Sequence, residues 1–148
     1  MPRPALVLDE YVQAEVSLQE AGAQAFDRLL RPPPMWTAVN VGHIELTAAQ
    51  AAKVYRVGVK PNWPDHLVIF PGKLVGIEWK TRDGALSISR VVHTRRSGRP
   101  RYVEGQRDVF PKLTLAGMRG PYVCITVEQA LRMLQAEGCP MLPWSMAA

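Results

Sequence analysis

The chain is 148 residues long, and 47% of its residues are hydrophobic while 21% are charged. This length suits one domain with a buried core and is too short for two ordinary domains. The composition is close to that of ordinary globular proteins, which excludes a disordered or a fibrous chain. A formal net charge of +5 favours a polyanionic partner, either nucleic acid or an anionic membrane surface.

The beginning of the chain, Met1-Pro2-Arg3-Pro4, lacks the apolar core of a signal peptide. No apolar run approaches the roughly 20 residues needed to cross a bilayer. We therefore expect a cytoplasmic protein. Cys124 and Cys139 have no metal-ligand spacing and can form one disulfide at most, and without an export signal we expect free thiols.

Three elements are predicted in the N-terminal part. Over Asp9–Leu30, apolar residues recur at spacings of three, four and seven, which predicts an amphipathic helix that Pro32–Pro34 ends. The β-branched and aromatic residues of Trp36–Val41 predict a strand. A second helix is predicted over Thr47–Gly58, because Thr47 and Gln50 have the spacing of a capping box and a glycine suits the position after a last turn.

Two hairpins are predicted next. The short apolar runs Leu67–Phe70 and Leu74–Ile77 lie on either side of Pro71-Gly72, a pair typical of a chain reversal. The segment Ser87–Val103 predicts another hairpin, with strand formers such as Ile88 on either side of a turn that contains a glycine and a proline.

The C-terminal part predicts a helix, a strand and a last helix. Gln106–Met118 is expected to be helical, with Pro111 in the first turn or at a kink because proline has no amide proton. Tyr122–Thr126 predicts a strand. Thr126 with Gln129 then opens a helix, whose inward side chains are Ala130, Leu131 and Leu134. The tail, residues 138–148, is expected to be irregular.

The order of these elements predicts an α/β sandwich with a mixed β-sheet flanked by helices. No internal repeat or low-complexity linker divides the chain. We therefore expect one domain over residues 1–148, with a core over about 10–136 and a basic hairpin inserted at about 87–104.

The first hairpin is expected to gather charged side chains. Asp65 and Glu78 each lie six residues from the Pro71-Gly72 pair, so a two-residue turn places them opposite each other, with Cβ atoms about 5 Å apart. L-proline fits such a turn imperfectly, so a slip by one residue stays open. Glu78 and Lys80 share a face of their strand, whereas Trp79 points to the other face.

These groups suit a metal site. Two facing carboxylates raise each other's pKa unless a cation lies between them. Mg²⁺ prefers oxygen ligands and commonly uses one or two carboxylates with waters and phosphate oxygens. Asp65, Glu78 and the backbone carbonyl of Trp79 are therefore candidate ligands. Lys80 can orient a water or stabilise charge on a phosphate. The alternative is an ordinary sheet with a solvated charge cluster.

Pro64-Asp65, an apolar strand, a short reversal and Glu78-Trp79-Lys80 resemble the signature of the PD-(D/E)XK nuclease superfamily. The similarity is closer to the VRR-NUC family and covers about residues 13–135. Its segments are Ala14–Gln19, Gly58–Lys60, Pro64–Asp65, Glu78–Lys80 and Glu104–Gln106. The resemblance implies a restriction-endonuclease-like core with the element order αβ(α)ββ, then the extra hairpin, then αβα. It also implies that the protein cleaves DNA with a divalent metal ion, Mg²⁺ or Mn²⁺.

The resemblance also implies individual roles. Asp65 and Glu78 correspond to metal ligands, Lys80 to the catalytic lysine, Glu15 to a further catalytic and metal-binding acid on the first helix, and Gln106 to the polar catalytic group that opens a later helix.

The chain departs from the family pattern in several places. Asn62-Trp63 stand where a glycine is common, and His66 stands where an apolar residue is common. The inserted segment 87–103 leaves the match of Gln106 open. Glu10 and Glu20 remain alternatives to Glu15 as the acid of the first helix.

Basic residues supply a candidate nucleic-acid interface. The inserted hairpin holds five arginines with no acidic residue before Glu104, a density that suits phosphate contacts but does not imply sequence readout. The alternative is a flexible solvated hairpin. The candidates are Lys53, Arg56, Lys60, Arg82, Arg90, Arg95, Arg96, Arg99 and Arg101.

Histidines and tryptophans give weaker signals. The histidines have no paired spacing, so structural or exposed roles are expected for His43, His66 and His93. Trp36 and Trp79 are expected in the core, whereas Trp63, beside the motif, stays a candidate for base stacking.

Together, these features favour a structure-selective or weakly specific DNA endonuclease. The resemblance implies branched, flapped or junction DNA, including Holliday junctions, as substrate in phage or bacterial replication, repair or recombination. It also implies a homodimer in the bacterial cytoplasm or a phage-infected host, with no membrane partner and no small-molecule cofactor besides the metal. Two alternatives remain: a catalytically weak or inactive DNA-binding module on the same fold, and an unrelated α/β protein that imitates the motif.

Overall fold

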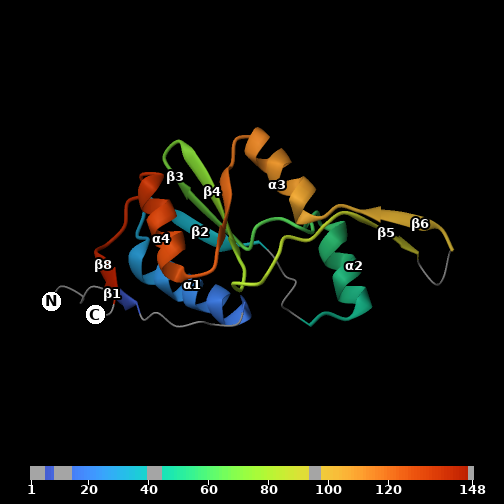
Figure 1. Cartoon of the computed structure of the whole chain (residues 1–148), viewed down its shortest axis with the longest axis horizontal. Helices are drawn as coiled ribbons and strands as arrows, with labels where there is room; N and C mark the ends of the chain where they lie inside the picture. The colour runs from blue at the N-terminus through green and yellow to red at the C-terminus, as the bar shows by residue number, and fades with distance from the viewer. Residues whose placement is uncertain (1–5, 9–14, 40–44, 94–97, 147–148) are drawn as a thin grey trace.

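The computed structural model describes residues 6–8, 15–39, 45–93 and 98–146 of the chain. A four-stranded sheet with the order β2-β3-β4-β7 lies at its centre (Figure 1). The strands are β2 (Met35–Ala38), β3 (His66–Phe70), β4 (Lys73–Trp79) and β7 (Arg119–Cys124). The pairs β2–β3 and β3–β4 are antiparallel, whereas β4 and β7 run parallel. The sheet is therefore mixed, as predicted.

Helices flank this sheet (Figure 1). α1 (Glu15–Leu29) and α4 (Val127–Ala136) contribute buried apolar side chains to the core on the Trp79 face. α3 (Gln106–Leu115) lies against β7 and reaches Glu78 on the opposite face through Gln106. α2 (Ala48–Arg56), all of whose residues are described, has no buried residue. The α/β class is confirmed at the level of a mixed sheet flanked by helices.

The N-terminal elements agree with prediction where they are described. Thr47 Oγ1 accepts a hydrogen bond from the Gln50 amide at 3.2 Å, and the Thr47 amide donates to Gln50 Oε1 at 2.8 Å, so the capping box before α2 is present. α1 ends at Leu29, one residue before the predicted end, and β2 ends earlier than predicted, at Ala38. The parts of both predicted elements that lie outside the described residues remain predictions.

The β3–β4 hairpin has the predicted register. Phe70 pairs with Lys73 across the Pro71-Gly72 turn, and His66 pairs with Ile77 at the other end. This pairing shows no slip by one residue. Continued by one step, the same register places Asp65 opposite Glu78, on one face of the hairpin.

The second predicted hairpin forms a separate two-stranded ribbon, β5 (Arg90–His93) with β6 (Pro100–Val103). Figure 1 shows this ribbon extending away from the central sheet. Ile88, predicted as a strand former, lies before the ribbon and is exposed. Pro100, predicted in the turn, is the first residue of β6.

Two predictions in the C-terminal half are wrong, and for Pro111 one of two alternatives is excluded. Pro111 lies in the second turn of α3, so it is not in the first turn, and a kink there stays a prediction. The predicted strand Tyr122–Thr126 begins earlier and ends at Cys124, because Thr126 caps α4 by accepting a hydrogen bond from the Gln129 amide at 3.1 Å. The tail, 138–148, is not irregular throughout, since β8 (Trp144–Met146) pairs in parallel with β1 (Leu6–Leu8). This pairing joins the two ends of the sequence, so local patterns could not reveal it.

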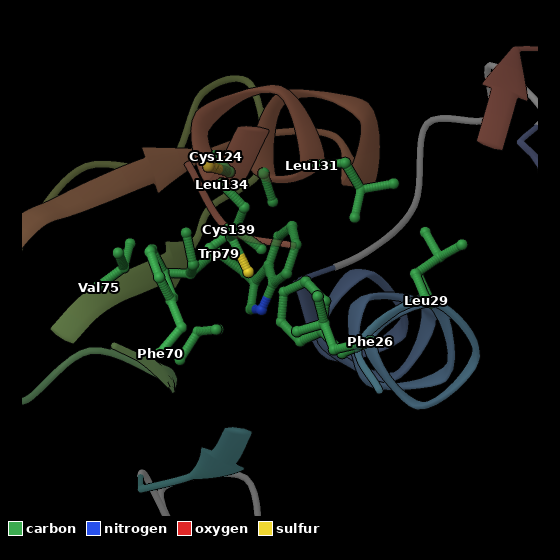
Figure 2. Packing of buried hydrophobic residues seen from close by; sticks show 14 of the residues in the cluster. Phe26, Leu29, Phe70, Val75, Trp79, Cys124, Leu131, Leu134 and Cys139 are labelled. Carbon is green, nitrogen blue, oxygen red and sulfur yellow. The ribbon is translucent and has the colours of Figure 1, made fainter. Parts of the chain in front are cut away.

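The hydrophobic core lies between the Trp79 face of the sheet and the helices α1 and α4. Figure 2 shows Trp79 and Phe26 beside each other in this cluster, with ring centroids 6.2 Å apart. Gly22 permits this packing, because a Cβ atom there would clash with the Trp79 ring. The inward positions predicted for α4 are confirmed, since Ala130, Leu131 and Leu134 are buried. The core also includes Leu6 and Cys139, beyond the predicted limits 10–136.

Cys124 and Cys139 are buried free thiols, as predicted. No helix in the described part of the chain combines the length and the hydropathy that a bilayer crossing requires.

Candidate active site

Two buried carboxylates lie at one end of the β3–β4 hairpin. Asp65 comes directly before β3 and Glu78 lies near the end of β4, and each side chain is 1% exposed. Asp65 Oδ2 accepts a hydrogen bond from the Trp79 amide at 2.8 Å. This bond fixes Asp65 to the partner strand beside Glu78, and the Coulomb repulsion between the two acids contributes to raising the pKa of Glu78. The predicted juxtaposition is therefore present.

The two carboxylate oxygens of Glu78 have different surroundings. Its Oε1 atom accepts a hydrogen bond from Gln106 Nε2 at 2.6 Å and lies 3.0 Å from Lys80 Nζ. Its Oε2 atom is buried and has no hydrogen-bond partner among the described residues. Burial, and after it the charge of Asp65, raise the pKa of Glu78, whereas Lys80 and Gln106 lower it, and the net pKa is about 7. A buried acceptor without a donor favours binding of a cation or a proton.

Lys80 and Gln106 both lie where the sequence predicted them. Lys80 follows β4 directly, its side chain is 12% exposed, and it shares the face of Glu78 because the two are two residues apart. Gln106 is the first residue of α3 and is buried. The inserted hairpin therefore does not displace Gln106 from the site.

A hydrogen-bonded loop holds Gln106 in place. The Ser87 amide donates to Gln106 Oε1 at 3.3 Å, and the Gln106 amide donates to Ser87 Oγ at 3.0 Å. Ser87 Oγ also donates to Asn62 Oδ1 at 3.4 Å, and Asn62 Nδ2 donates to the Glu104 carbonyl. Sequence reasoning missed Asn62 and Ser87 as supports. The available signal for Asn62 was its residue type, since asparagine tolerates the left-handed backbone that it adopts at φ 66°.

The candidate backbone carbonyl belongs to Trp79, the last residue of β4, which directly follows Glu78. Glu15 is the first residue of α1, but its side chain lies outside the described residues, as does Glu10. Glu20 is exposed. Gln19, one turn after Glu15, has a buried Oε1 atom without a hydrogen-bond partner among the described residues. The choice of the acid on α1 therefore stays a prediction.

The donor set fits a hard divalent cation. Asp65 and Glu78 supply buried carboxylate oxygens, and the Oε2 atom of Glu78 lacks a donor. Oxygen ligands of this kind are those that Mg²⁺ and Mn²⁺ prefer. Among the described side chains, no group of three or more histidines, cysteines or acids converges. The described residues thus offer two carboxylates as candidate ligands, with the Trp79 carbonyl as a third candidate.

The predicted basic residues are distributed over separate elements. Lys53 and Arg56 are exposed in the last turn of α2, and Lys60 is exposed after it. Arg82 is exposed two residues after Lys80. On the ribbon, Arg90, Arg99 and Arg101 are exposed, whereas Arg95 and Arg96 lie outside the described residues.

Structural roles were expected for the histidines and for two of the tryptophans, and His43 lies outside the described residues. His66 is buried in the core, where its Nδ1 accepts a hydrogen bond from Trp79 Nε1 at 2.8 Å, and burial lowers its pKa to about 4. It is therefore a neutral structural residue, and His93 is exposed on β5. Trp63 is half-buried and lines a cavity of about 480 Å³ that also borders Gly72, at the turn end of the hairpin. Trp36 is partly buried against the core, as predicted.

Comparison of the chain with protein-family models, with curated proteins and with solved structures found no match.

Proposed function

We propose that this protein is a divalent-metal-dependent DNA endonuclease that hydrolyses phosphodiester bonds at the Asp65–Glu78–Lys80 site. The observation that carries the proposal is the buried carboxylate pair, with a lysine beside it and Glu78 Oε2 lacking a donor. A structural salt bridge alone would satisfy its buried acceptors, whereas this arrangement leaves one open for a ligand.

The proposed ligands are Asp65, Glu78, the Trp79 backbone carbonyl and Glu15, which would hold Mg²⁺ or Mn²⁺. When bound, such an ion supplies Lewis acidity and lowers the pKa of a coordinated water. Asp65 is held for this role by the Trp79 amide. Gln106 fixes Glu78 by occupying Oε1, which leaves Oε2 directed to the ligand.

Lys80 is the proposed catalytic lysine. Its ammonium group lies 3.0 Å from Glu78 Oε1 and brings a positive charge to the carboxylate pair, where it can orient a water or a phosphate oxygen. A fixed positive charge in a protected site stabilises the negative charge that develops on a phosphate during hydrolysis.

The sign of the surface charge supports a nucleic-acid substrate. The chain carries a formal net charge of +5, and exposed lysines and arginines lie on α2, after β4 and on the ribbon. Such groups bind phosphates and release counterions, so affinity should fall steeply with salt. No sequence specificity follows from phosphate contacts.

The finer assignments belong to the same proposal. The order of elements and the Pro-Asp and Glu-x-Lys spacing support a restriction-endonuclease-like core of the PD-(D/E)XK type, with similarity to VRR-NUC domains. We therefore propose branched, flapped or junction DNA as substrate, in replication, repair or recombination in a bacterial or phage-infected cytoplasm. A homodimer would bring two such sites to the two strands of a junction.

Cleavage of defined substrates tests the proposal. Purified protein is incubated with labelled flap, four-way junction and continuous duplex DNA in Mn²⁺ or Mg²⁺, with chelator as a blank. We expect metal-dependent products that Asp65→Asn and Glu78→Gln abolish. Arg28→Ala, a change at an exposed residue of α1, is the matched control. Absence of products on all substrates, or equal cleavage by the Glu78 variant, would refute the proposed nuclease activity. Salt-dependent DNA binding without cleavage would instead indicate a DNA-binding module.

A further inference from the structure

The β5–β6 ribbon exposes an apolar and aromatic face. Val91 pairs with Tyr102, and His93 pairs with Pro100, so these four side chains lie on one face of the ribbon. Val91 is 56% exposed and Tyr102 is 62% exposed. An isolated two-stranded ribbon is only marginally stable in water, and adjacent exposed apolar groups commonly mark an interaction surface. This face is therefore a candidate for a bound partner.

The opposite face and the flanks of the ribbon are basic. Arg90 and Arg101 belong to the other two residue pairs, whose side chains point away from Tyr102. The segment 90–103 contains five arginines and no acidic residue. Two copies of this ribbon would therefore repel each other, whereas a polyanion would be attracted. Charge thus favours nucleic acid over a second copy of the chain as the occupant.

The ribbon is firmly attached at its base. Ser89 Oγ accepts a hydrogen bond from the Gly105 amide at 2.9 Å, and the Arg107 amide donates to the Ser87 carbonyl at 3.1 Å. Gly105 allows this close approach, because a Cβ atom there would clash with the backbone of Ile88. The same loop positions Gln106 against Glu78. A nucleic acid held on the ribbon would consequently lie on an element joined directly to the carboxylate site.

We propose that Tyr102, with Val91 beside it, binds an unstacked base in a single-stranded segment of DNA, while the ribbon arginines hold the neighbouring phosphates. A continuous duplex offers phosphates but no free base face, so only the arginines engage it. The stacking site deepens the proposed function by selecting DNA with unpaired bases. It rests on that function only for its connection with cleavage.

Binding measured without turnover tests this site. Fluorescence anisotropy in EDTA compares the full chain on labelled single-stranded, flapped and continuous duplex DNA. Because stacking one base on an aromatic ring contributes a large part of single-strand affinity, Tyr102→Ala should weaken binding of single-stranded and flapped DNA by about fivefold or more. Duplex affinity should stay unchanged, and Tyr102→Trp should retain tight binding to all three. Tyr55→Ala, at an exposed tyrosine of α2 that is 52% exposed, is the matched control.

Fluorescence of a base analogue gives a second, independent measurement of stacking. 2-Aminopurine at the unpaired position should be quenched by the wild type and by Tyr102→Trp, and should not be quenched by Tyr102→Ala. Val91→Ser should give a smaller loss in the same direction. Circular dichroism melting checks that each variant is folded.

Three results would overturn the stacking site. These are equal losses on duplex and unpaired DNA, no loss with Tyr102→Ala, and a Tyr102→Ala variant that binds DNA normally but changes from dimer to monomer in light scattering. The last result would assign the face to a second copy. These readouts do not depend on cleavage, so a failed nuclease assay with an intact Tyr102 effect rejects only the proposed function.

Discussion

The buried carboxylate pair predicts an unusual dependence of stability on pH in the metal-free protein. Burial, the charge of Asp65 and the opposing effects of Lys80 and Gln106 together raise the pKa of Glu78 from 4.5 to about 7. The folded state therefore binds a proton that the unfolded state releases between these two values. One pKa unit corresponds to about 1.36 kcal/mol, so the contribution of Glu78 to the free energy of unfolding should fall by roughly 2 to 3 kcal/mol between pH 5 and pH 8.

The pH dependence of stability that Glu78 contributes has the opposite sign to that of His66. Stability that depends on a raised carboxyl pKa is complete below the unfolded value and is lost as pH rises through the folded value. His66 acts oppositely, because burial lowers its pKa from 6.5 to about 4 and the folded state is disfavoured as pH falls through this range. The wild-type curve contains both effects, so the difference between wild type and Glu78→Gln is the quantity that isolates Glu78.

Urea unfolding in EDTA at pH 5, 6.5 and 8 measures this difference. We expect Glu78→Gln to gain stability relative to the wild type as pH rises, by roughly 2 to 3 kcal/mol over the range. Added Mn²⁺ should stabilise the wild type at pH 8, by about 2.7 kcal/mol at a concentration one hundred times its dissociation constant, and should not stabilise the variant. A stability difference that is independent of pH would refute the raised pKa, and equal Mn²⁺ effects on both proteins would refute Glu78 as a ligand.

Further changes give equally direct outcomes. Gln106→Ala removes the 2.6 Å hydrogen bond to Glu78, so cleavage should fall about tenfold or more and the pH–rate profile should shift to higher pH, since Gln106 lowers the pKa of Glu78. Gly22→Ala places a methyl group against the Trp79 ring and should lower the free energy of unfolding by about 1–3 kcal/mol in urea titrations. Glu137 is buried and accepts hydrogen bonds from Arg119 Nε, the Tyr122 hydroxyl and Lys73 Nζ, so Glu137→Gln should destabilise the fold by about 1–3 kcal/mol at pH 7. Because hydrogen bonds and cations lower the pKa of Glu137 to about 2, this deficit should disappear as pH falls from 4.5 towards that value.

Local rules predicted the parts of the fold that are determined locally. The Pro71-Gly72 turn fixed the hairpin register, and with it the opposition of Asp65 and Glu78, because strand side chains alternate strictly. The capping pairs at Thr47 and Thr126 similarly located the starts of α2 and α4. In each case the residues that carry the sequence signal are within a few positions of the element that they determine.

Non-local pairing escaped the same rules. The parallel pairing of β1 with β8 depends on residues from opposite ends of the chain, so the C-terminal tail carried no turn or hairpin signal. Asn62 and Ser87 act through contacts 25 residues apart, and only their meeting in space identifies them as supports of Gln106. The hydrogen bond between Glu78 and Gln106 joins residues 28 positions apart. The family resemblance had implied a role for Gln106 in the site, but not this bond.

The inserted hairpin illustrates why a departure from a pattern need not disrupt a site. An insertion between Lys80 and Gln106 lengthens the connection. The position of Gln106, however, is determined by its two hydrogen bonds with Ser87 at the start of the insertion, not by the length of chain between them. The two ends meet where Gly105 lets the backbone of α3's cap lie against Ser87 and Ile88, so the ribbon extends outward from a closed base. Residues of the ribbon itself can therefore vary with little effect on Glu78, whereas the closed base must be kept. The proposed DNA-binding surface can therefore change on this element without altering the geometry of the carboxylates.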